Sequence, residues 1–319
     1  MNRVRTLLGS AVLEIILAVL CIVLAAIAPY FLTADNLLNV LRSVSMQGLI
    51  ALGMTMVIIA GEIDLSVGSM VAFAGCLTAW CTEWLTGSLG VPMVPAIIVA
   101  IVISLTAGFG LGCFTGLLRT RYQVPSFITT LALLTGLMGA AELITNGFPL
   151  TPFPSWYNFL GGGYLVGVPF PALVFLLAFA AVHVLMNYTS FGRSVYAVGG
   201  NAEAARLSGI NVSLVKIMVL AITSMLAAAS GVMQSSEIMS GTATTAKGWE
   251  LDVIAAVIIG GTSLLGGVGR VWGTMVGVIF LGIIMNGMTL LNVSEYWQHV
   301  VRGALILLAV LINRLQQRS

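Results

Sequence analysis

Two carboxylates stand in an otherwise apolar region of the chain and could do chemistry there. The string Gly61-Glu62-Ile63-Asp64-Leu65-Ser66-Val67-Gly68 joins two apolar segments. A carboxylate in mid-bilayer costs roughly 2.5 to 3.5 kcal/mol on insertion scales, so Glu62 and Asp64 predict a wet turn or a broken helix. We expect Glu62, Asp64, Ser66 and Gly68 to form a gate or such a break. The alternative is purely structural, with Asp64 or Ser66 capping the next helix.

A second polar cluster lies in residues 188–212, which we expect to be a cytoplasmic loop. Asn201 is a good N-cap, Glu203 lies in the first turn, Arg206 falls near the end and Gly209 can close a short helix. A charged, well-capped surface helix with little apolar area suits insertion into a partner's groove. A solvated connector is the alternative interpretation.

Several other chemistries lack the residues that they need. A phosphate-binding loop requires a lysine after glycine, and neither Lys216 nor Lys247 follows one. The two histidines, His183 and His299, have no acidic or thiol companion at ligand spacing. The four cysteines form no C-x-x-C pair, and a net charge of +2 gives no basis for binding nucleic acid. We therefore predict no catalytic residue, cofactor or metal site.

Glycines recur every four residues at two places in the chain. The two ladders are Gly108, Gly112 and Gly116, and Gly269, Gly273 and Gly277. This spacing lets another helix approach closely and misses the dinucleotide-binding pattern. We predict helix packing at both ladders, with a moving gate as the alternative. The strings at 57–61 and 257–261 are also alike, which indicates either a duplication or a coincidence of apolar residues.

Membrane-spanning helices must position these residues, because 59% of the chain is hydrophobic and only 8% is charged, against roughly 25% in soluble domains. A span needs about 20 apolar residues. We predict an all-α polytopic membrane protein with about ten transmembrane helices, forming a single domain over residues 1–319. The predicted spans are 11–28, 43–60, 66–85, 94–118, 124–145, 166–187, 213–233, 250–265, 271–290 and 298–313. The first is interpreted as an uncleaved anchor, with a cleaved secretory signal as the alternative.

The distribution of lysine and arginine predicts the orientation in the membrane. With a cytoplasmic N-terminus, the outside receives only Arg42, Lys247 and Arg302. The inside receives Arg3, Arg5, Arg119, Arg121, Arg193, Arg206, Lys216, Arg270, Arg314 and Arg318. We therefore expect both termini inside and residues 146–165 in a periplasmic loop. The aromatic residues of that loop would form a membrane-interface belt, or else a docking surface for a soluble partner.

Three long strings resemble one family of transport proteins. They are the Gly61 to Gly68 string, the stretch GRSVYAVGGNAEAARLSGINV from Gly192 to Val212, and GGTSLLGGVGR from Gly260 to Arg270. In this order they are similar to the permeases of ribose-type ABC sugar importers, and the similarity runs from the first span to the last. In that family the string before Ile63 usually reads Gly-Gly, so Glu62 is a departure from it.

The resemblance implies a non-enzymatic permease subunit in a bacterial inner membrane, surrounded by lipid. It implies three protein partners: a second permease copy or paralogue, a cytoplasmic ATP-binding subunit that hydrolyses ATP, and a periplasmic sugar-binding protein. It also implies that Asn201, Glu203, Ala204, Arg206 and Gly209 belong to the coupling helix that docks onto the ATPase. A pentose or hexose would then enter the cytoplasm by alternating access.

A polyol pathway needs uncharged hydrogen-bonding groups on the spans. The candidates are Asn39, Gln47, Thr130, Asn146, Gln234 and Asn286. Each could equally form a hydrogen bond between packed helices.

Two rival functions remain open on the sequence. An ion-coupled secondary carrier would need an intramembrane carboxylate, for which Glu14, Glu142, Glu250 and Asp252 are the candidates, although they fall toward span ends. A permease of the same superfamily for nucleosides, branched-chain amino acids or an autoinducer sugar is the nearer rival.

Overall fold

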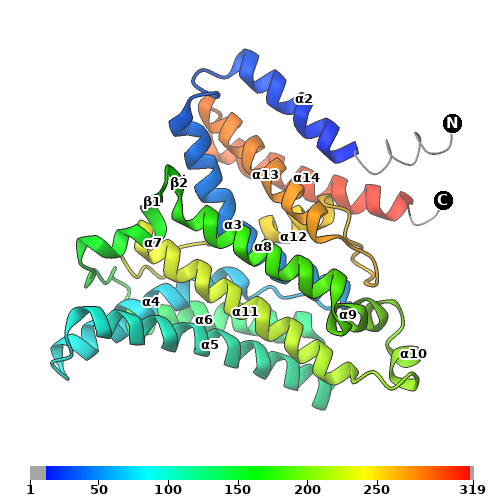
Figure 1. Cartoon of the computed structure of the whole chain (residues 1–319), viewed down its shortest axis with the longest axis horizontal. Coiled ribbons are helices and arrows are strands. Elements are labelled where there is room, and N and C mark those ends of the chain that lie inside the picture. The colour runs from blue at the N-terminus through cyan, green and yellow to red at the C-terminus, as the bar shows by residue number, and fades with distance from the viewer. Residues whose placement is uncertain (1–11, 317–319) are drawn as a thin grey trace.

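A computed structural model of the protein describes residues 12–316, and these residues are almost entirely helical (Figure 1). The first half contains α2 (Val12–Ile27), α3 (Ala34–Ile59), α4 (Val67–Gly87), α5 (Met93–Arg121) and α6 (Ser126–Thr145). A short connecting region holds η1 (Ser155–Asn158), α7 (Phe159–Gly162) and the antiparallel hairpin of β1 (Tyr164–Leu165) and β2 (Val168–Pro169). The second half contains α8 (Phe170–Tyr188), α9 (Ser190–Gly200), α10 (Ala202–Leu207), α11 (Val212–Glu237), α12 (Trp249–Ile259), α13 (Val271–Leu290) and α14 (Glu295–Gln316).

The predicted all-α class is confirmed, and six helices of the described chain are long and apolar enough to cross a membrane: α3, α5, α6, α8, α11 and α13. One predicted boundary is wrong because α3 begins at Ala34, well before residue 43. Thr33 caps its first turn by accepting a hydrogen bond from the Asn36 amide. Asp35 and Asn36 therefore belong to the first turn of α3 and do not form a loop before it.

The predicted span at 250–265 is also wrong in its extent, because α12 ends at Ile259. Gly261 has φ +88°, and its amide donates to the Ile258 carbonyl, which closes the helix. The 11 residues of α12 extend only about 16 Å, roughly half the thickness of a bilayer core. Upstream of it, Gly241 lies against Ala79 of α4 and the Ala246 carbonyl lies against Gly68, which Glu250 in the first turn of α12 also contacts. Residues 238–248 therefore run along α4, and α12 begins at the depth where α4 begins.

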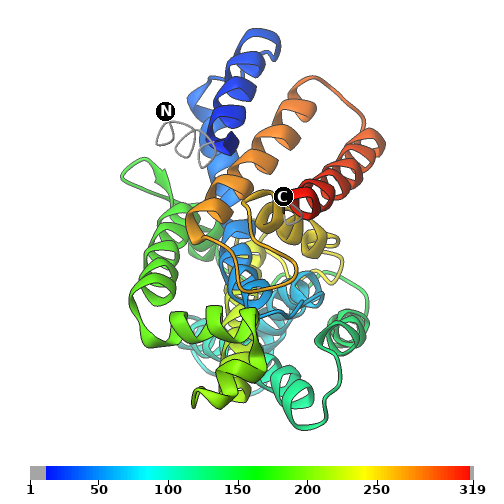
Figure 2. The ribbon, with the colours of Figure 1, turned by 90° about the vertical axis from the view of Figure 1, so that its right-hand side faces the viewer.

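The core is built around α3 and α11, which cross the centre of the bundle (Figures 1 and 2). Most of α3 is buried, and α11 packs against α3, α4 and α5. On α5, a Cβ added to Gly112 would come within 2.5 Å of the Leu220 carbonyl oxygen of α11, and one added to Gly116 would come equally close to the Ile217 Cα. Glycine at these positions lets the two helix backbones touch, which adds dispersion contacts without side chains between them.

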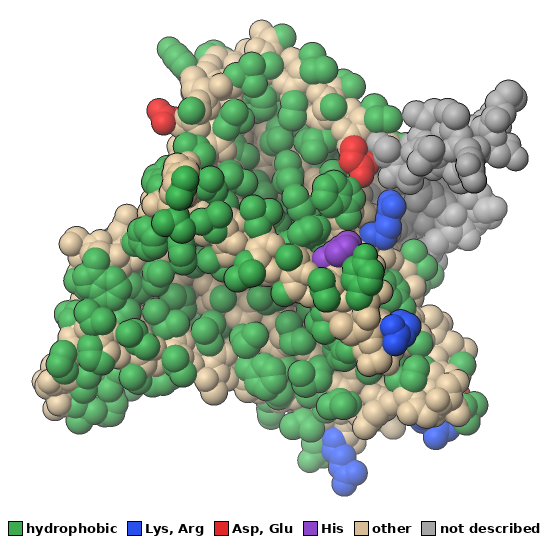
Figure 3. All heavy atoms as spheres, viewed as in Figure 1, with side chains coloured by type: hydrophobic (Ala, Val, Ile, Leu, Met, Phe, Trp, Pro, Cys, Tyr) green, Lys and Arg blue, Asp and Glu red, His purple; other side chains and the backbone are tan. Residues whose placement is uncertain are grey.

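Apolar side chains cover most of the face in Figure 3, and the lysines and arginines on it gather toward the end that carries α9 and α10. The beginning of α2 and the end of α14 lie at this same end, and the β1–β2 hairpin lies at the opposite one (Figure 1). Arg119 and Arg121 end α5 there as well. Arg3, Arg5 and Arg318 of the predicted inside set lie outside the described residues, and so does the Arg314 side chain.

The two predicted loops contain more structure than expected. Residues 190–200 form α9, which comes before the short helix predicted at 201–209. In the 146–165 region, η1 provides a short helix at Trp156, but Tyr157 is fully buried and does not belong to an interfacial aromatic belt. Its hydroxyl group bonds Ser235 of α11 at 2.9 Å, so this residue anchors the loop to the bundle.

Candidate functional site

The turn between α3 and α4 breaks the path of the chain inside the bundle. Gly61, at φ +76°, ends α3, and the Glu62 amide donates to the Val57 carbonyl at 3.0 Å. Asp64 Oδ1 then accepts from the Ser66 amide at 2.8 Å and from its hydroxyl at 2.6 Å. These bonds satisfy a backbone that lipid could not solvate. Ser66 holds the N-cap position of α4 but makes no side-chain capping bond, so Asp64 provides the polar contact at this turn.

Glu62 is the centre of a charged cluster that joins four elements. It is 4% exposed, and its Oε1 lies 2.8 Å from Arg119 Nε at the end of α5 and 2.5 Å from Lys216 Nζ on α11. Its Oε2 accepts from the Ser126 hydroxyl, at the start of α6, at 2.6 Å. Charge-assisted bonds of this kind are about twice as strong as neutral ones. The cluster therefore holds the turn against α5, α6 and α11.

Asp64 lies in a different environment from Glu62. It is 1% exposed, and its Oδ2 lies 3.5 Å from the Ser224 hydroxyl, near the middle of α11. Within residues 12–316, the hydrogen-bond partners of Asp64 are hydroxyl and amide groups, and none of them is a cation. The partial positive charge at the N-terminus of α4 is the nearest compensation for a negative Asp64.

The predicted short surface helix is α10, and its caps have the geometry that the residue types indicate. Asn201 accepts a hydrogen bond from the Ala204 amide at 2.9 Å, and Gly209 follows the helix at φ +84°. Arg206 binds Glu203 through two nitrogens, at 3.0 and 2.6 Å. This pairing lowers the pKa of Glu203 and raises the pKa of Arg206. Both side chains remain mostly exposed, so α10 presents a rigid, charged surface away from the bundle.

The three strings that resemble one family meet at one junction, where a Cβ added to Gly266 would lie 2.8 Å from the Gly199 carbonyl oxygen and 3.1 Å from the Gly61 Cα. The Gly267 amide donates to the Ile59 carbonyl, the last residue of α3, at 2.8 Å. Gly199 of α9 packs against that same carbonyl, with no room for a Cβ. Tyr196, also on α9, donates from its hydroxyl to the Gly269 carbonyl at 3.0 Å. The end of α3, the helix before α10 and the α12–α13 loop are therefore in direct contact.

The two similar strings at 57–61 and 257–261 form the same turn. Thr262 donates from its amide to Val257, just as Glu62 donates to Val57, and both turns place a glycine at positive φ. Of the second glycine ladder, Gly273 and Gly277 pack against α12, whereas Gly269 lies before α13 and contacts the Ile59 side chain. The second ladder therefore packs against α12 through Gly273 and Gly277, and against the end of α3 through Gly269.

The polar residues predicted to line a pathway separate into two groups. Asn39, Gln47 and Asn286 line one cavity between α3 and α13. The other three lie elsewhere: Thr130 is buried beside the Ile63 carbonyl, Asn146 is the C-cap of α6, and Gln234 bonds Glu237 on α11.

The four carboxylates considered for an ion-coupled carrier lie in unlike surroundings. Glu142 is exposed, Glu14 accepts from the Trp272 indole at 3.2 Å, and Glu250 is half-buried beside Gly68. Asp252 lies in the first turn of α12 and is 7% exposed, and Arg302 Nε of α14 lies 2.8 Å from its Oδ1. Sequence reasoning placed Arg302 outside and missed this pair. It likewise missed the cations at Glu62, although an intramembrane carboxylate calls for a partner.

Comparison with known proteins identifies the family. The profile described as "Branched-chain amino acid transport system / permease component" matches residues 36–310. The ribose import permease protein RbsC of Bacillus subtilis is 44% identical over 93% of this chain and 90% of its own length. RbsC of Escherichia coli K12 is 38% identical over 95% and 93%, and the xylose transport system permease protein XylH of the same strain is 35% identical over 90% and 87%. No solved structure matches the chain significantly. The chain therefore belongs to the ABC-transporter permease family that contains the ribose and xylose permeases.

Proposed function

We propose that this chain is the membrane-spanning subunit of a binding-protein-dependent ABC importer that moves a pentose or hexose into the cytoplasm. The similarity of nearly the whole chain to ribose and xylose permeases supports a monosaccharide substrate. Branched-chain amino acids are the second candidate, because the family description names them. The proposed location is a bacterial inner membrane.

The proposed partners are a second permease subunit, a cytoplasmic ATP-binding subunit and a periplasmic sugar-binding protein. The observation that carries the proposal is α10, an exposed helix with satisfied caps and a surface ion pair. On this proposal, residues 188–212 form the cytoplasmic loop and α10 docks onto the ATP-binding subunit. Motion of that subunit would reach the bundle through two sets of contacts. One is the junction between α9, the end of α3 and the α12–α13 loop, and the other is the Glu62 cluster.

The proposed topology has about ten crossings with both termini inside. Besides the six long apolar helices, α2, α4 and α14 would cross the membrane. The tenth crossing would combine residues 238–248 with the half-length α12. The gathering of arginines at the end that carries α10 supports a cytoplasmic assignment for that end (Figure 3). Residues 146–165 would then face the periplasm.

Mild purification of the chain from native membranes tests the proposal. An ATP-binding subunit should travel with it, and its retention should fall in the double variant Glu203→Ala/Arg206→Ala. A matched control is Glu142→Ala, since Glu142 is exposed at the opposite end of the bundle. Sugar transport by the purified chain alone, without ATP, would contradict the proposal.

A further inference from the structure

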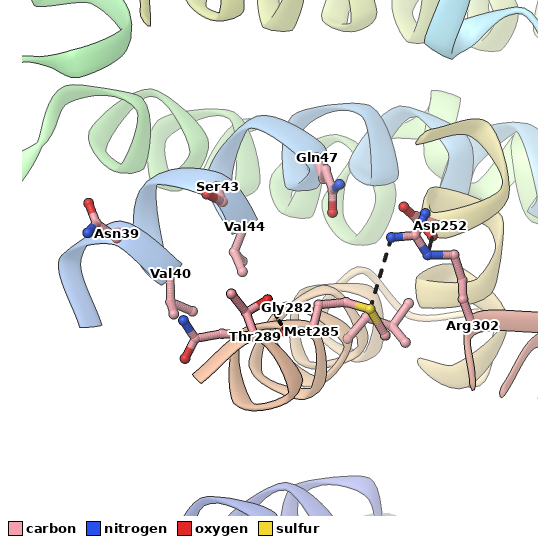
Figure 4. Close-up of a pocket in the computed structure, with 12 residues that line it drawn as sticks. Asn39, Val40, Ser43, Val44, Gln47, Asp252, Gly282, Met285, Thr289 and Arg302 are labelled. Carbon is pink, nitrogen blue, oxygen red and sulfur yellow. Dashed lines mark hydrogen bonds and ion pairs between the residues drawn. The ribbon is translucent and has the colours of Figure 1, made fainter. Parts of the chain in front are cut away.

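A cavity of about 290 Å³ lies between α3, α12, α13 and α14 (Figure 4). Asn39, Ser43 and Gln47 follow one another at intervals of four residues along α3, so they share one face of that helix. Thr289 of α13 lies across from them, and the Asp252–Arg302 pair forms one end of the cavity (Figure 4). Asn286 of α13 also lines the cavity. Val40, Val44, Leu281 and Met285 complete the lining, so the cavity offers both polar groups and apolar side chains to a ligand.

The cavity extends inward from the end of the bundle opposite α10. α3 begins and α13 ends at that opposite end (Figure 1). Asn39 and Thr289 are exposed, Gln47 lies halfway along α3 and is half-buried, and Asp252 is buried. A solute arriving from the side away from α10 would thus meet the amide groups first and the ion pair last.

Two polar side chains of the cavity are available to a neutral ligand. Gln47 and Ser43 form no hydrogen bond within the described part of the chain, although polar groups on a span are costly unless satisfied. The charge of Asp252 is matched by Arg302, so the ion pair adds donors and acceptors but no net charge. Asn286 and Asn36 bond each other reciprocally, at 2.8 and 3.0 Å, which fixes the Asn286 amide.

We propose that this cavity is a binding site, within a single subunit, for a neutral polyhydroxylated solute of monosaccharide size. Its volume is near the lower limit of about 300 Å³ for small-molecule pockets, which suits a ligand smaller than a drug. The hydroxyl groups of such a solute match the amide, hydroxyl and carboxylate groups of the lining, and its C–H groups can pack on the apolar side chains. An ionised solute is disfavoured because Arg302 is already paired. The inference rests on the proposed function, since it gives the imported sugar a place in the permease.

Two substitutions change the cavity without touching α10 or the Glu62 cluster. Gln47→Leu removes an unpaired amide, and Ser43→Leu places a larger apolar side chain inside the cavity. Thr135→Leu is the control, because this exposed residue lies on α6 outside the cavity. Uptake of labelled D-ribose and D-xylose is measured in cells that carry the full chain with its partners. At subsaturating sugar, Gln47→Leu should lower uptake roughly 3- to 10-fold, as expected for one lost hydrogen bond. Ser43→Leu should lower it at least as much, and the control less than twofold.

Chemical labelling provides a second measurement that does not depend on transport. The Ser43→Cys variant is made in a chain whose partly exposed Cys21 and Cys113 are replaced by alanine. A membrane-impermeant maleimide should modify Cys at this position from outside, and the transported sugar should slow the reaction, whereas D-gluconate should not. If the unmodified chain imports sugar but both leucine variants match it, or sugar gives no protection, the binding site is refuted while the proposed function stands. If the unmodified chain with its ATP-binding partner imports no sugar, the proposed function itself fails.

Discussion

Replacing Glu62 by glutamine tests the idea that one buried carboxylate holds the α3–α4 turn in place. The substitution keeps the size of the side chain and removes its charge. Lys216, whose side chain is 13% exposed, and Arg119, at 30%, then lose the negative group that lies 2.5 and 2.8 Å from them. The Ser126 hydroxyl retains an acceptor, because the glutamine carbonyl can take the place of Oε2.

The magnitude follows from the burial of the two cations. Removing one partner of a buried ion pair costs about 3 to 5 kcal/mol, because the other charge stays desolvated. Arg119 is open enough for water to take over part of that role, so the lower end, about 3 kcal/mol, applies here. This free energy corresponds to a change of roughly 100-fold in the unfolding equilibrium. At about 2 °C per kcal/mol for a chain of this size, the apparent Tm should fall by about 6 °C.

Thermal unfolding in mild detergent, followed by tryptophan fluorescence, measures this change. Glu83→Gln is the control, since Glu83 is an exposed carboxylate with no ion pair among the described residues. In the double variant Glu62→Gln/Lys216→Met the unpaired cation is gone, so at least half of the lost stability should return. A single variant that unfolds within about 1 °C of the unmodified protein, or a double variant less stable than the single one, would refute the reasoning.

Three further predictions concern helix packing and α10. Gly112→Leu should sharply reduce the yield of folded protein, since even a Cβ there would meet the α11 backbone; Gly110→Leu, with nothing within 4 Å, should not, and size-exclusion chromatography compares the two. Asn201→Ala should weaken the cap of α10 by about 1 kcal/mol and reduce retention of the ATP-binding subunit in pull-downs, whereas Asn201→Ser should preserve both. Arg206 lowers the pKa of Glu203 in the folded helix, so the pair stabilises α10 above the ordinary glutamate value of 4.5 and is lost as the pH falls through the lowered pKa. Pull-downs at decreasing pH should therefore weaken with the unmodified chain, and Glu203→Gln should lose that contribution to the pH dependence.

The elements that depend on local sequence could be predicted. The cap at Asn201 and the closure at Gly209 follow from interactions between residues a few positions apart, and α10 has the geometry expected from them. The break between α3 and α4 follows from charge in an apolar region. The extent of α12 was predicted wrongly because its apolar composition continues through Leu264 and Leu265, while the two glycines at 260 and 261 decide where the helix ends.

Contacts between residues far apart in sequence could not be predicted in the same way. Glu62 and Lys216 are 154 positions apart, and only the packing of α3 against α11 brings them together. The rule that an intramembrane carboxylate needs a partner indicates that a cation exists, but not which one. Asp252 and Arg302 show the same limit. The cavity depends on the relative placement of four helices, so the sequence could supply its amide residues but not their grouping.

The position of α10 in the chain gives it two connections to the same turn. Before it, α9 packs Gly199 on the carbonyl of Ile59, the last residue of α3. After it, α11 carries Lys216, which binds Glu62, the residue directly after Gly61. A displacement of α10 that preserves both contacts must therefore move the end of α3 together with the start of α4. Since α3 also carries Asn39 and Gln47, the same displacement would alter the cavity at the other end of the helix. If α10 docks onto the ATP-binding subunit as proposed, weakening the Glu62 cluster would reduce transport as well as stability, because the turn would deform and the motion would not reach α3.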